Sequence, residues 1–248
     1  MQTTPASVSS PGEEKTLDAA YLEWKNWASD EFARYNNVEA AYFAAEVPIR
    51  PPARLLEIGF GNGGFLSWAR KTGADTFGVE TNQSLVSRAK HLLGESHAFA
   101  SVYDPELDAH RGSFTHIVAF DVLEHIPQTE YPALFRRLAE LLAAGGRCTL
   151  RFPNGDSPFG RAVQHGDPTH VTTIGGAKLA YFAIGAGLKV DTIRAPALPT
   201  NNIGLRRALR RRVALLLRFV VESVVGYAYF GRRVCFDQNL LVVIVREP

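Results

Sequence analysis

The chain has 248 residues, of which 46% are hydrophobic and 21% are charged. This composition is typical of a folded globular protein and excludes a fibrous or largely disordered chain. The formal net charge is only +2, and the two cysteines, Cys148 and Cys235, lie far apart, which argues against a disulfide scaffold and a zinc site. No uninterrupted apolar run reaches the ~18 residues of a membrane span, so we expect a cytoplasmic protein.

The N-terminal region divides into two parts. Residues 1–13 are rich in Ser, Thr and Pro and lack a basic start and an apolar segment, which predicts a disordered tail rather than a signal peptide. Residues 14–50 carry apolar and aromatic residues at helical spacing and predict one or two helices with a break at Asn36 and Asn37. These helices would pack on the domain as part of its core or act as a lid over a ligand.

Residues 51–248 form one predicted domain in which strands and helices alternate. The expected strands are Leu55–Ile58, Asp75–Glu80, His97–Val102, Phe114–Val122, Arg147–Phe152, Leu188–Arg194 and Asn239–Arg246. The expected helices are Phe65–Lys71, Asn82–Leu93, Pro132–Ala144 (ended by Gly145 and Gly146), Ile174–Ala186 and a basic helix within 203–230. This alternation predicts an α/β fold, a Rossmann-like doubly wound sheet with helices on both faces.

A glycine-rich turn follows the first strand. Gly59, Gly61 and Gly64 satisfy the spacing of a nucleotide-binding turn, and Glu80 lies 21 residues beyond Gly59; these features suit a nicotinamide or flavin dinucleotide as well as S-adenosylmethionine. Glu57, two residues before the first glycine, favours the second ligand. A carboxylate there would repel a diphosphate by on the order of 1 kcal/mol but would attract a cation.

Several segments together resemble the class I S-adenosylmethionine-dependent methyltransferases. They are Leu55–Phe65, Phe77–Glu80, His116–Pro127 and Gly145–Asn154, and the resemblance extends over about Ala53–Val245. It implies a seven-stranded sheet whose last strand is antiparallel and inserted between strands five and six. It also implies S-adenosylmethionine as the cofactor and S-adenosylhomocysteine as the product.

The resemblance also implies roles for individual residues. Those expected to line the methionine and ribose part of the cofactor are Glu57, Gly59, Phe60, Gly61 and Asn62, with Glu80 on the ribose hydroxyls. Those expected around the adenine are Thr81, Val102, Tyr103 and, as a partner of its amino group, Asp104. Asp121 and Val122 would lie beneath the sulfonium.

A polar cluster after the fifth strand is the candidate acceptor site. His165, Asp167 and His170 lie within six positions on the segment 153–173, where they could act as acid/base or substrate-binding groups, or simply brace the loop. Their spacing is not diagnostic of a metal site, and no metal is predicted. His125 is a further candidate base, although Leu-Glu-His after the fourth strand is also a common structural signature.

The same segment carries a looser resemblance. Asn154–His170, the helix after it and the residues Gly185–Leu188 resemble methyltransferases of bacterial surface-polysaccharide and related glycan pathways. This implies O-methylation of a hydroxyl on a small-molecule or glycan acceptor. The alternatives are an NAD(P)-dependent oxidoreductase and a non-catalytic methyltransferase-like subunit.

The basic helix bears on the partners of the protein. At 100° per residue one face carries Leu205, Leu209, Val213, Leu216 and Val220, and the other carries Arg207, Arg210, Arg211 and Arg218. The helix could contact a membrane peripherally through 205–221, at the inner face, or pack on the sheet with a solvated basic face. No aromatic residues lie among the arginines, so nucleic acid is not expected. The oligomeric state is not predicted.

Overall fold

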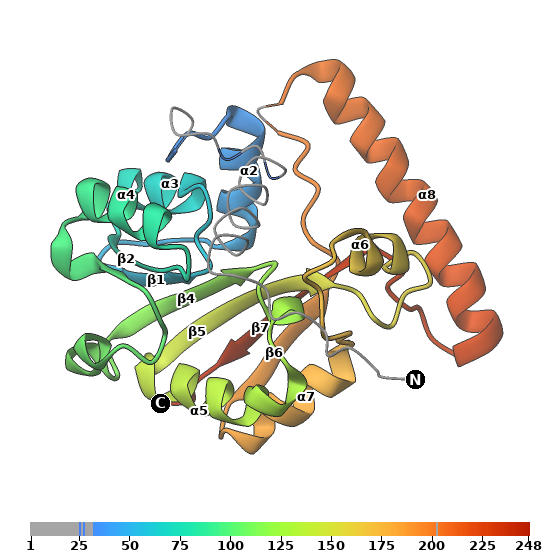
Figure 1. The fold of residues 1–248 in the computed structure, drawn as a ribbon. Coiled ribbons are helices and arrows are strands. Elements are labelled where there is room, and N and C mark those ends of the chain that lie inside the picture. Colours follow the sequence, from blue (N-terminus) through green and yellow to red (C-terminus); the bar gives the residue numbers. More distant parts are fainter. Residues whose placement is uncertain (1–24, 26, 28–31, 202) are drawn as a thin grey trace, which may run out of the picture.

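The computed structural model describes residues 25, 27, 32–201 and 203–248, and its centre is a seven-stranded sheet (Figure 1). The strands are β1 (Arg54–Ile58), β2 (Asp75–Val79), β3 (Ala98–Phe99), β4 (Phe114–Phe120), β5 (Leu142–Pro153), β6 (Lys189–Arg194) and β7 (Asn239–Val245). Their order is β3-β2-β1-β4-β5-β7-β6, and β7 runs antiparallel to both of its neighbours. The predicted Rossmann-like sheet, with an antiparallel last strand between β5 and β6, is confirmed.

Helices cover both faces of the sheet. They are α2 (Asn37–Glu46), α3 (Gly64–Lys71), α4 (Gln83–Leu93), α5 (Tyr131–Leu141), α6 (Arg161–Gly166), α7 (Gly176–Gly185) and α8 (Leu205–Phe230). In Figure 1, α2, α3 and α4 lie above the sheet, α5 and α7 lie below it, and α8 stands off to one side. Because β1 has β2 on one side and β4 on the other, the chain reverses its direction of winding beside the glycine turn, which is where ligands bind in such sheets.

The apolar residues of the strands and helices form the core as their periodicity predicts. One large cluster joins the sheet to α5 and α7, and includes Tyr131, Phe135, Phe114 and Phe152, which are all fully buried. Smaller clusters pack α2 and α3, and then α4, against the other face. Both cysteines are free thiols.

Some predicted boundaries are wrong. The helix predicted for Pro132–Ala144 ends at Leu141, and β5 begins at Leu142 rather than at Arg147. The cause is distant in sequence: Arg246, after β7, donates to the carbonyls of Ala139 and Leu142 and pairs through its backbone with Gly146. The third strand is also shorter than predicted, since only Ala98 and Phe99 pair with β2.

The described part of the N-terminal region lies over the glycine turn. The predicted break at Asn36 is the N-cap of α2, where the Asn36 side chain accepts hydrogen bonds from the backbone N–H groups of Val38 and Glu39. Trp27 contacts the turn at Gly61, and Phe32 contacts it at Gly63. The predicted tail, 1–13, lies outside the described residues, and the lid stays a prediction.

Helix α8 contradicts one of the two alternatives for its packing. The leucines and valines predicted to form one face are exposed, so the alternative of a helix packed on the sheet with only its basic face in solvent is wrong. Among the described residues α8 is also the one helix long and apolar enough to cross a membrane, with a mean hydropathy of 1.7 over 18 residues. Arg218 and Glu222 interrupt its apolar run, which is why the sequence showed no candidate span.

Candidate functional site

The glycine turn after β1 is shaped by close contacts. Gly59 has φ +69°, and a Cβ atom there would lie 2.5 Å from Cγ2 of Val122. Gly61 has φ +51°, and its Cβ would lie 2.7 Å from the ring of Trp27. Only glycine adopts such angles without strain, and its lack of a side chain lets Val122 and Trp27 approach the backbone of the turn closely.

Two acids stand at the ends of β1 and β2, beside this turn. Glu57 is buried, and its Oε2 atom has no hydrogen-bond partner among the described residues. Burial, and then the nearby Glu80 carboxylate, raise the pKa of Glu57 well above its usual value. The Glu80 carboxylate accepts hydrogen bonds from the N–H groups of Gly61 and Asn82, each at 3.1 Å. A ligand that carries a sulfonium and ribose hydroxyls would bring positive charge to this pair of acids, and its hydroxyls could donate further hydrogen bonds to Glu80.

The other predicted cofactor residues take different positions. The side chain of Phe60 is buried against Gly78 in the core below α4, so its predicted contact with the cofactor could be made only through its backbone. The Asn62 side chain accepts from the N–H of Gly64, and Thr81 donates to Glu80.

On the adenine side, Val102 is buried and Tyr103 is half-exposed. Asp104 uses its carboxylate to cap the short helix Pro105–His110 by accepting from the N–H of Glu106 at 3.0 Å. Asp104 therefore has a structural role in the polar loop after the third strand, where it stabilises the start of this short helix.

Asp121 ends β4 in an unusual conformation, with φ +58° at a non-glycine residue. Its carboxylate forms an ion pair with Arg151 of β5, and Arg151 also donates to the Tyr42 hydroxyl at 2.9 Å. Burial alone would lower the pKa of Arg151, but the Asp121 carboxylate outweighs it and raises that pKa. Sequence reasoning missed Arg151 and Tyr42; an arginine within an otherwise apolar strand was the available signal.

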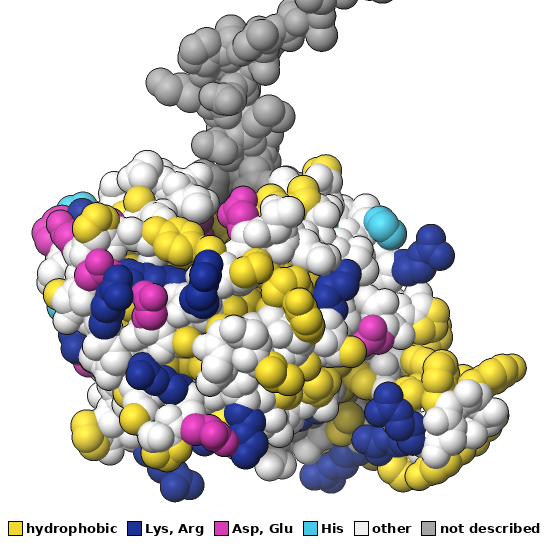
Figure 2. Space-filling model, turned by 90° about the horizontal axis from the view of Figure 1, so that it is seen from below, with side chains coloured by type: hydrophobic (Ala, Val, Ile, Leu, Met, Phe, Trp, Pro, Cys, Tyr) yellow, Lys and Arg dark blue, Asp and Glu magenta, His cyan; other side chains and the backbone are white. Residues whose placement is uncertain are grey.

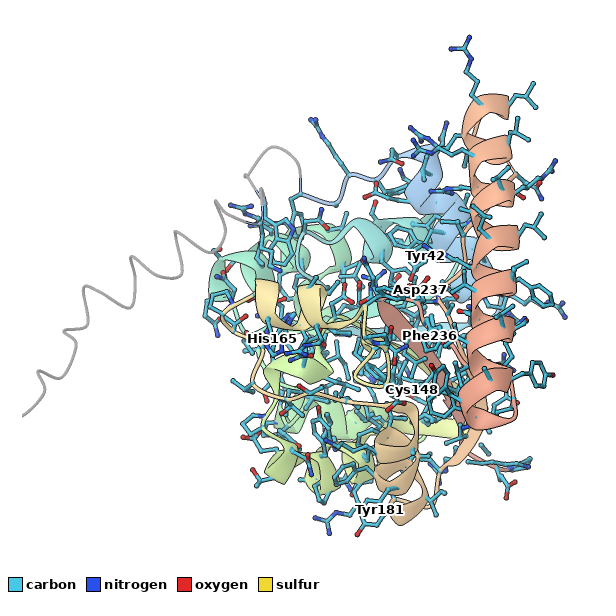
Figure 3. All side chains as sticks on the ribbon, turned by 90° about the vertical axis from the view of Figure 1, so that its right-hand side faces the viewer. Tyr42, Cys148, His165, Tyr181, Phe236 and Asp237 are labelled. Carbon is cyan, nitrogen blue, oxygen red and sulfur yellow. The ribbon has the colours of Figure 1, made fainter. Side chains whose placement is uncertain are left out.

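A cavity of about 300 Å³ lies beyond the ends of β4 and β5; we call it the acceptor cavity. Its lining residues are Lys25, Asp121, Glu124, His125, Ala162, Val163, Gly166, Asp167, His170 and Asn239. The structure therefore brings the predicted His125, Asp167 and His170 together, although His125 is more than 40 positions from the other two. The prediction of His165 as an acceptor-site residue is wrong. His165 is exposed on α6 (Figure 3) and is not among the described residues that line the cavity.

A chain of hydrogen bonds fixes His125. Asp167 accepts from Lys25 at 2.9 Å and from the Thr169 hydroxyl at 2.5 Å. Since that hydroxyl donates its hydrogen to Asp167, its oxygen must accept from His125, whose Nδ1 lies 2.9 Å away. Nδ1 therefore carries the hydrogen, and Nε2 has the free lone pair. Burial, and then His170, lower the pKa of His125, which keeps the ring neutral at pH 7.

Asp167 itself is not a suitable base. Burial would raise its pKa, but the hydrogen bonds from Thr169 and Lys25 lower it to about 2. Both of its oxygens already accept hydrogen bonds. Asp167 is thus an anchor that positions Thr169 and, through it, His125.

Glu124 and His170 complete the cavity wall, and sequence reasoning missed Glu124. Both Glu124 oxygens are buried and have no hydrogen-bond partner in the part of the chain that the structure describes. Burial, and then the Asp121 carboxylate, raise the pKa of Glu124 to about 8. The Nδ1 atom of His170 lies 3.1 Å from the carbonyl of Gln164, while Nε2 lies 3.9 Å from Glu124. Potential ligand atoms of Glu124, His125 and His170 lie within 4.8 Å of one another, a group that the sequence prediction of no metal did not consider.

Residues 30–193 match a protein family described as a methyltransferase domain, which is more than half of the chain. The chain belongs to this family. S-adenosylmethionine is accordingly the cofactor of this methyltransferase, and the oxidoreductase alternative is set aside. The orphaned Glu57 oxygen and the Glu80 carboxylate fit that cofactor, as described above. No curated protein matches the sequence.

Solved structures share the fold of the methyltransferase at low sequence identity. A SAM-dependent methyltransferase from Archaeoglobus fulgidus is 15% identical, with a TM-score of 0.61 over 91% of this chain and 99% of that one. One from Mesorhizobium loti is 16% identical, with a TM-score of 0.55 over 82% and 95%. Geranyl diphosphate C-methyltransferase from Streptomyces coelicolor, solved with Mg²⁺, is 16% identical, with a TM-score of 0.54 over 84% and 78%.

Proposed function

We propose that the methyltransferase transfers a methyl group to a hydroxyl of a small-molecule or glycan acceptor, with His125 as the general base. The observation that carries the proposal is the Asp167–Thr169–His125 chain, which leaves a neutral imidazole with a free Nε2 at the acceptor cavity. A hydroxyl needs such a base because it must lose its proton as it forms the new bond. An amine or an activated carbon would place different demands on this site.

The side chains around the acceptor cavity have different roles in the proposed methyl transfer. S-adenosylmethionine held beside Glu57 and Glu80 would supply an electrophilic methyl group, with the electrons of its bond to carbon remaining on sulfur. The acceptor oxygen forms the new bond to this carbon while Nε2 of His125 takes the hydroxyl proton. Glu124, with a pKa of about 8, is protonated at pH 7 and can donate a hydrogen bond to the acceptor or to His170. The Asp121–Arg151 pair fixes the edge of the cavity.

A sugar hydroxyl is the acceptor that the lining favours. The cavity is lined by a carboxyl group, two imidazoles and an amide, from Glu124, His125, His170 and Asn239, and several hydroxyls on one molecule can pair with such groups. We propose a role in glycan or surface-polysaccharide biosynthesis, at the cytoplasmic side of a membrane, where a lipid-linked glycan is presented. The exposed apolar helix α8 supports that location.

The test compares His125 and His165, which were both predicted from the sequence as candidate catalytic residues. Tritium-labelled methyl transfer is measured with free hexoses, nucleotide-activated sugars, extracted membrane glycolipids, phenols and amines. His125→Asn retains a donor toward Thr169 but has no basic nitrogen at the cavity, and should lower the rate by about 10²- to 10⁴-fold. His165→Asn, the same change outside the cavity, should retain full activity.

Titration with S-adenosylhomocysteine separates binding from chemistry. Both variants should bind it as the wild type does, because neither residue contacts the glycine turn. Transfer to amines alone would refute the hydroxyl acceptor. Unchanged transfer by His125→Asn would refute the base, and cofactor binding without transfer to any acceptor would favour a non-catalytic subunit.

A further inference from the structure

Helix α8 presents its large apolar side chains outward. The exposed ones are Leu205, Leu209, Val213, Leu215, Leu216, Leu217, Phe219, Val220, Val221, Val224, Tyr227, Tyr229 and Phe230. Only Ala208 and Gly226 are buried. Figure 2 shows hydrophobic and basic side chains gathered at the right-hand edge of the molecule, where α8 lies. A helix on a water-soluble surface has the opposite arrangement.

Polar and small residues hold α8 to the domain. Arg218 forms an ion pair with Asp237, and Glu222 accepts from the N–H of Phe236 at 3.0 Å. A Cβ atom on Gly226 would lie 2.5 Å from the carbonyl oxygen of Arg232, so the chain after the helix packs directly on this glycine. Figure 3 shows Phe236 and Asp237 on the side of α8 that faces the sheet. The inward face of α8 is therefore occupied by the chain that follows the helix. The apolar side chains of α8 are exposed and have no partner among the described residues.

The apolar surface of α8 is too wide for one partner helix. In the stretch 213–230, the exposed apolar residues cover roughly three-quarters of the circumference at 100° per residue. A coiled-coil partner covers a narrow seam of a and d positions. The hydrocarbon of a bilayer is a continuous apolar medium and can contact all of these exposed apolar side chains at once.

Arginines stand at both ends of this apolar stretch. Arg206, Arg207, Arg210 and Arg212 are exposed at its start, and Arg232 and Arg233 are exposed just after its end. Each basic residue near an anionic membrane surface contributes about 1 kcal/mol of attraction. The charge at the two ends thus complements anionic lipid headgroups, while the side chains between them complement the acyl chains.

The sheet excludes a transmembrane orientation of α8. The strands on either side of it in sequence, β6 and β7, are paired, with Arg194 opposite Leu241. A helix that crossed the bilayer would place these strands on opposite sides of ~30 Å of hydrocarbon. The connection 231–238 would then have to return through lipid as irregular backbone, whose polar groups have no partners there. Both ends of α8 must stay on one side.

We propose that α8 is a monotopic membrane anchor that lies in the plane of one leaflet and binds bilayers rich in anionic lipids. The anchor adjoins the acceptor cavity. The chain after α8 is bound to Asn154 and Ser157 through the carbonyls of Cys235 and Phe236, and Asn239 at its end lines the cavity. The bilayer contact does not depend on the reaction, whereas a lipid-linked acceptor rests on the proposed function.

Sedimentation with vesicles tests the anchor on the full chain. The protein is mixed with vesicles of phosphatidylcholine alone or with 30% phosphatidylglycerol. We expect the bound fraction to be at least about 10-fold larger on the anionic vesicles at low salt, and to fall at high salt. Leu216→Asp, Val220→Asp and Val224→Asp together should abolish binding. Arg206→Glu, Arg207→Glu and Arg210→Glu together should abolish the preference for phosphatidylglycerol.

A matched control changes exposed apolar residues elsewhere. Tyr181 and Ile184 are 74% and 67% exposed on α7, and Figure 3 shows Tyr181 below the lower end of α8, on a different helix. Tyr181→Asp with Ile184→Asp should bind vesicles as the wild type does. Equal loss in this control, or no binding by the wild type, overturns the proposal. So does a dimer by light scattering that the α8 triple variant converts to monomer without any vesicle binding, which would make α8 a subunit interface.

The depth of α8 tests its orientation. A Leu216→Trp variant is bound to vesicles that carry bromine either near the headgroup end or near the methyl end of the acyl chains. Its fluorescence, corrected with a Leu216→Phe variant, should be quenched more by the shallow bromines. Stronger quenching by the deep bromines would overturn the in-plane orientation.

Discussion

The two halves of the sheet build their sites in different ways. Around β1 and β2, Glu57 and Glu80 occupy the ends of neighbouring strands, and the N–H groups that donate to Glu80 lie within about twenty residues of it in the sequence. Around β4 and β5, the acidic groups are held by distant partners: Asp121 by Arg151, and Asp167 by Lys25. The first half is a local arrangement of strand, turn and helix, whereas the second exists only once the chain has folded.

This difference makes the two halves vulnerable to different changes. A substitution in the glycine turn acts through the backbone and should affect cofactor binding and stability together. A substitution in the acceptor cavity acts through side-chain charge and hydrogen bonds, and should affect chemistry and pH dependence while cofactor binding remains. Variants in each half therefore test whether the two sites depend on different interactions.

The largest effect is expected at Gly59. Gly59→Ala combines a positive φ with a Cβ 2.5 Å from Val122, and should lower the free energy of unfolding by about 2–4 kcal/mol and weaken S-adenosylhomocysteine binding at least 10-fold. Gly112→Ala is the matched control, since Gly112 has φ +65° and no atom of the described residues lies within 4 Å of the added Cβ. It should lose only about 1 kcal/mol. Urea unfolding measures both; equal losses would show that the contact with Val122 does not matter.

Glu124 should make stability depend on pH. Its pKa is raised from 4.5 to about 8 in the folded protein, so its contribution is fully present below pH 4.5 and is lost as the pH rises through 8. Glu124→Gln does not titrate. Its free energy of unfolding relative to the wild type should rise by roughly 2–4 kcal/mol between pH 5 and pH 9. The exposed Glu106→Gln serves as control in urea unfolding, and a pH-independent difference for Glu124→Gln would contradict the raised pKa.

Thr169 should have a smaller effect, confined to the rate. Thr169→Val keeps the shape of the side chain but removes the hydroxyl that joins His125 to Asp167, and should lower the rate of methyl transfer about 10-fold. Thr169→Ser keeps the hydroxyl and should restore most of the rate. Equal rates in the two variants would show that the hydrogen-bond chain does not orient His125.

Metal removal should have the smallest effect. Because His125 acts as the base in the proposed reaction, dialysis against EDTA should leave the rate of methyl transfer unchanged. Loss of activity that Mg²⁺ or Mn²⁺ restores would assign Glu124, His125 and His170 to a metal ion, and His125 could then not be the free base.

The local parts of the fold followed directly from the sequence. The alternation of strands and helices, the turn after β1 and the acids Glu57 and Glu80 were all predicted, because periodicity and glycine spacing act over a few residues. The end of α5 was not, since Arg246 binds its last carbonyls from more than a hundred positions away. His165 was grouped with its neighbours in sequence, but the turn of α6 points it away from the cavity.

By itself, the sequence determined the class of sheet, the cofactor turn and the presence of a long helix with apolar and basic faces. Only the tertiary structure decided which face of α8 meets the domain, because the ion pair to Asp237 and the close packing at Gly226 come from the chain that follows the helix. It likewise decided which nitrogen of His125 is free, through a hydroxyl 44 positions away. Amphipathic periodicity shows that a helix has two faces, but the partners that fold against it determine which one remains exposed.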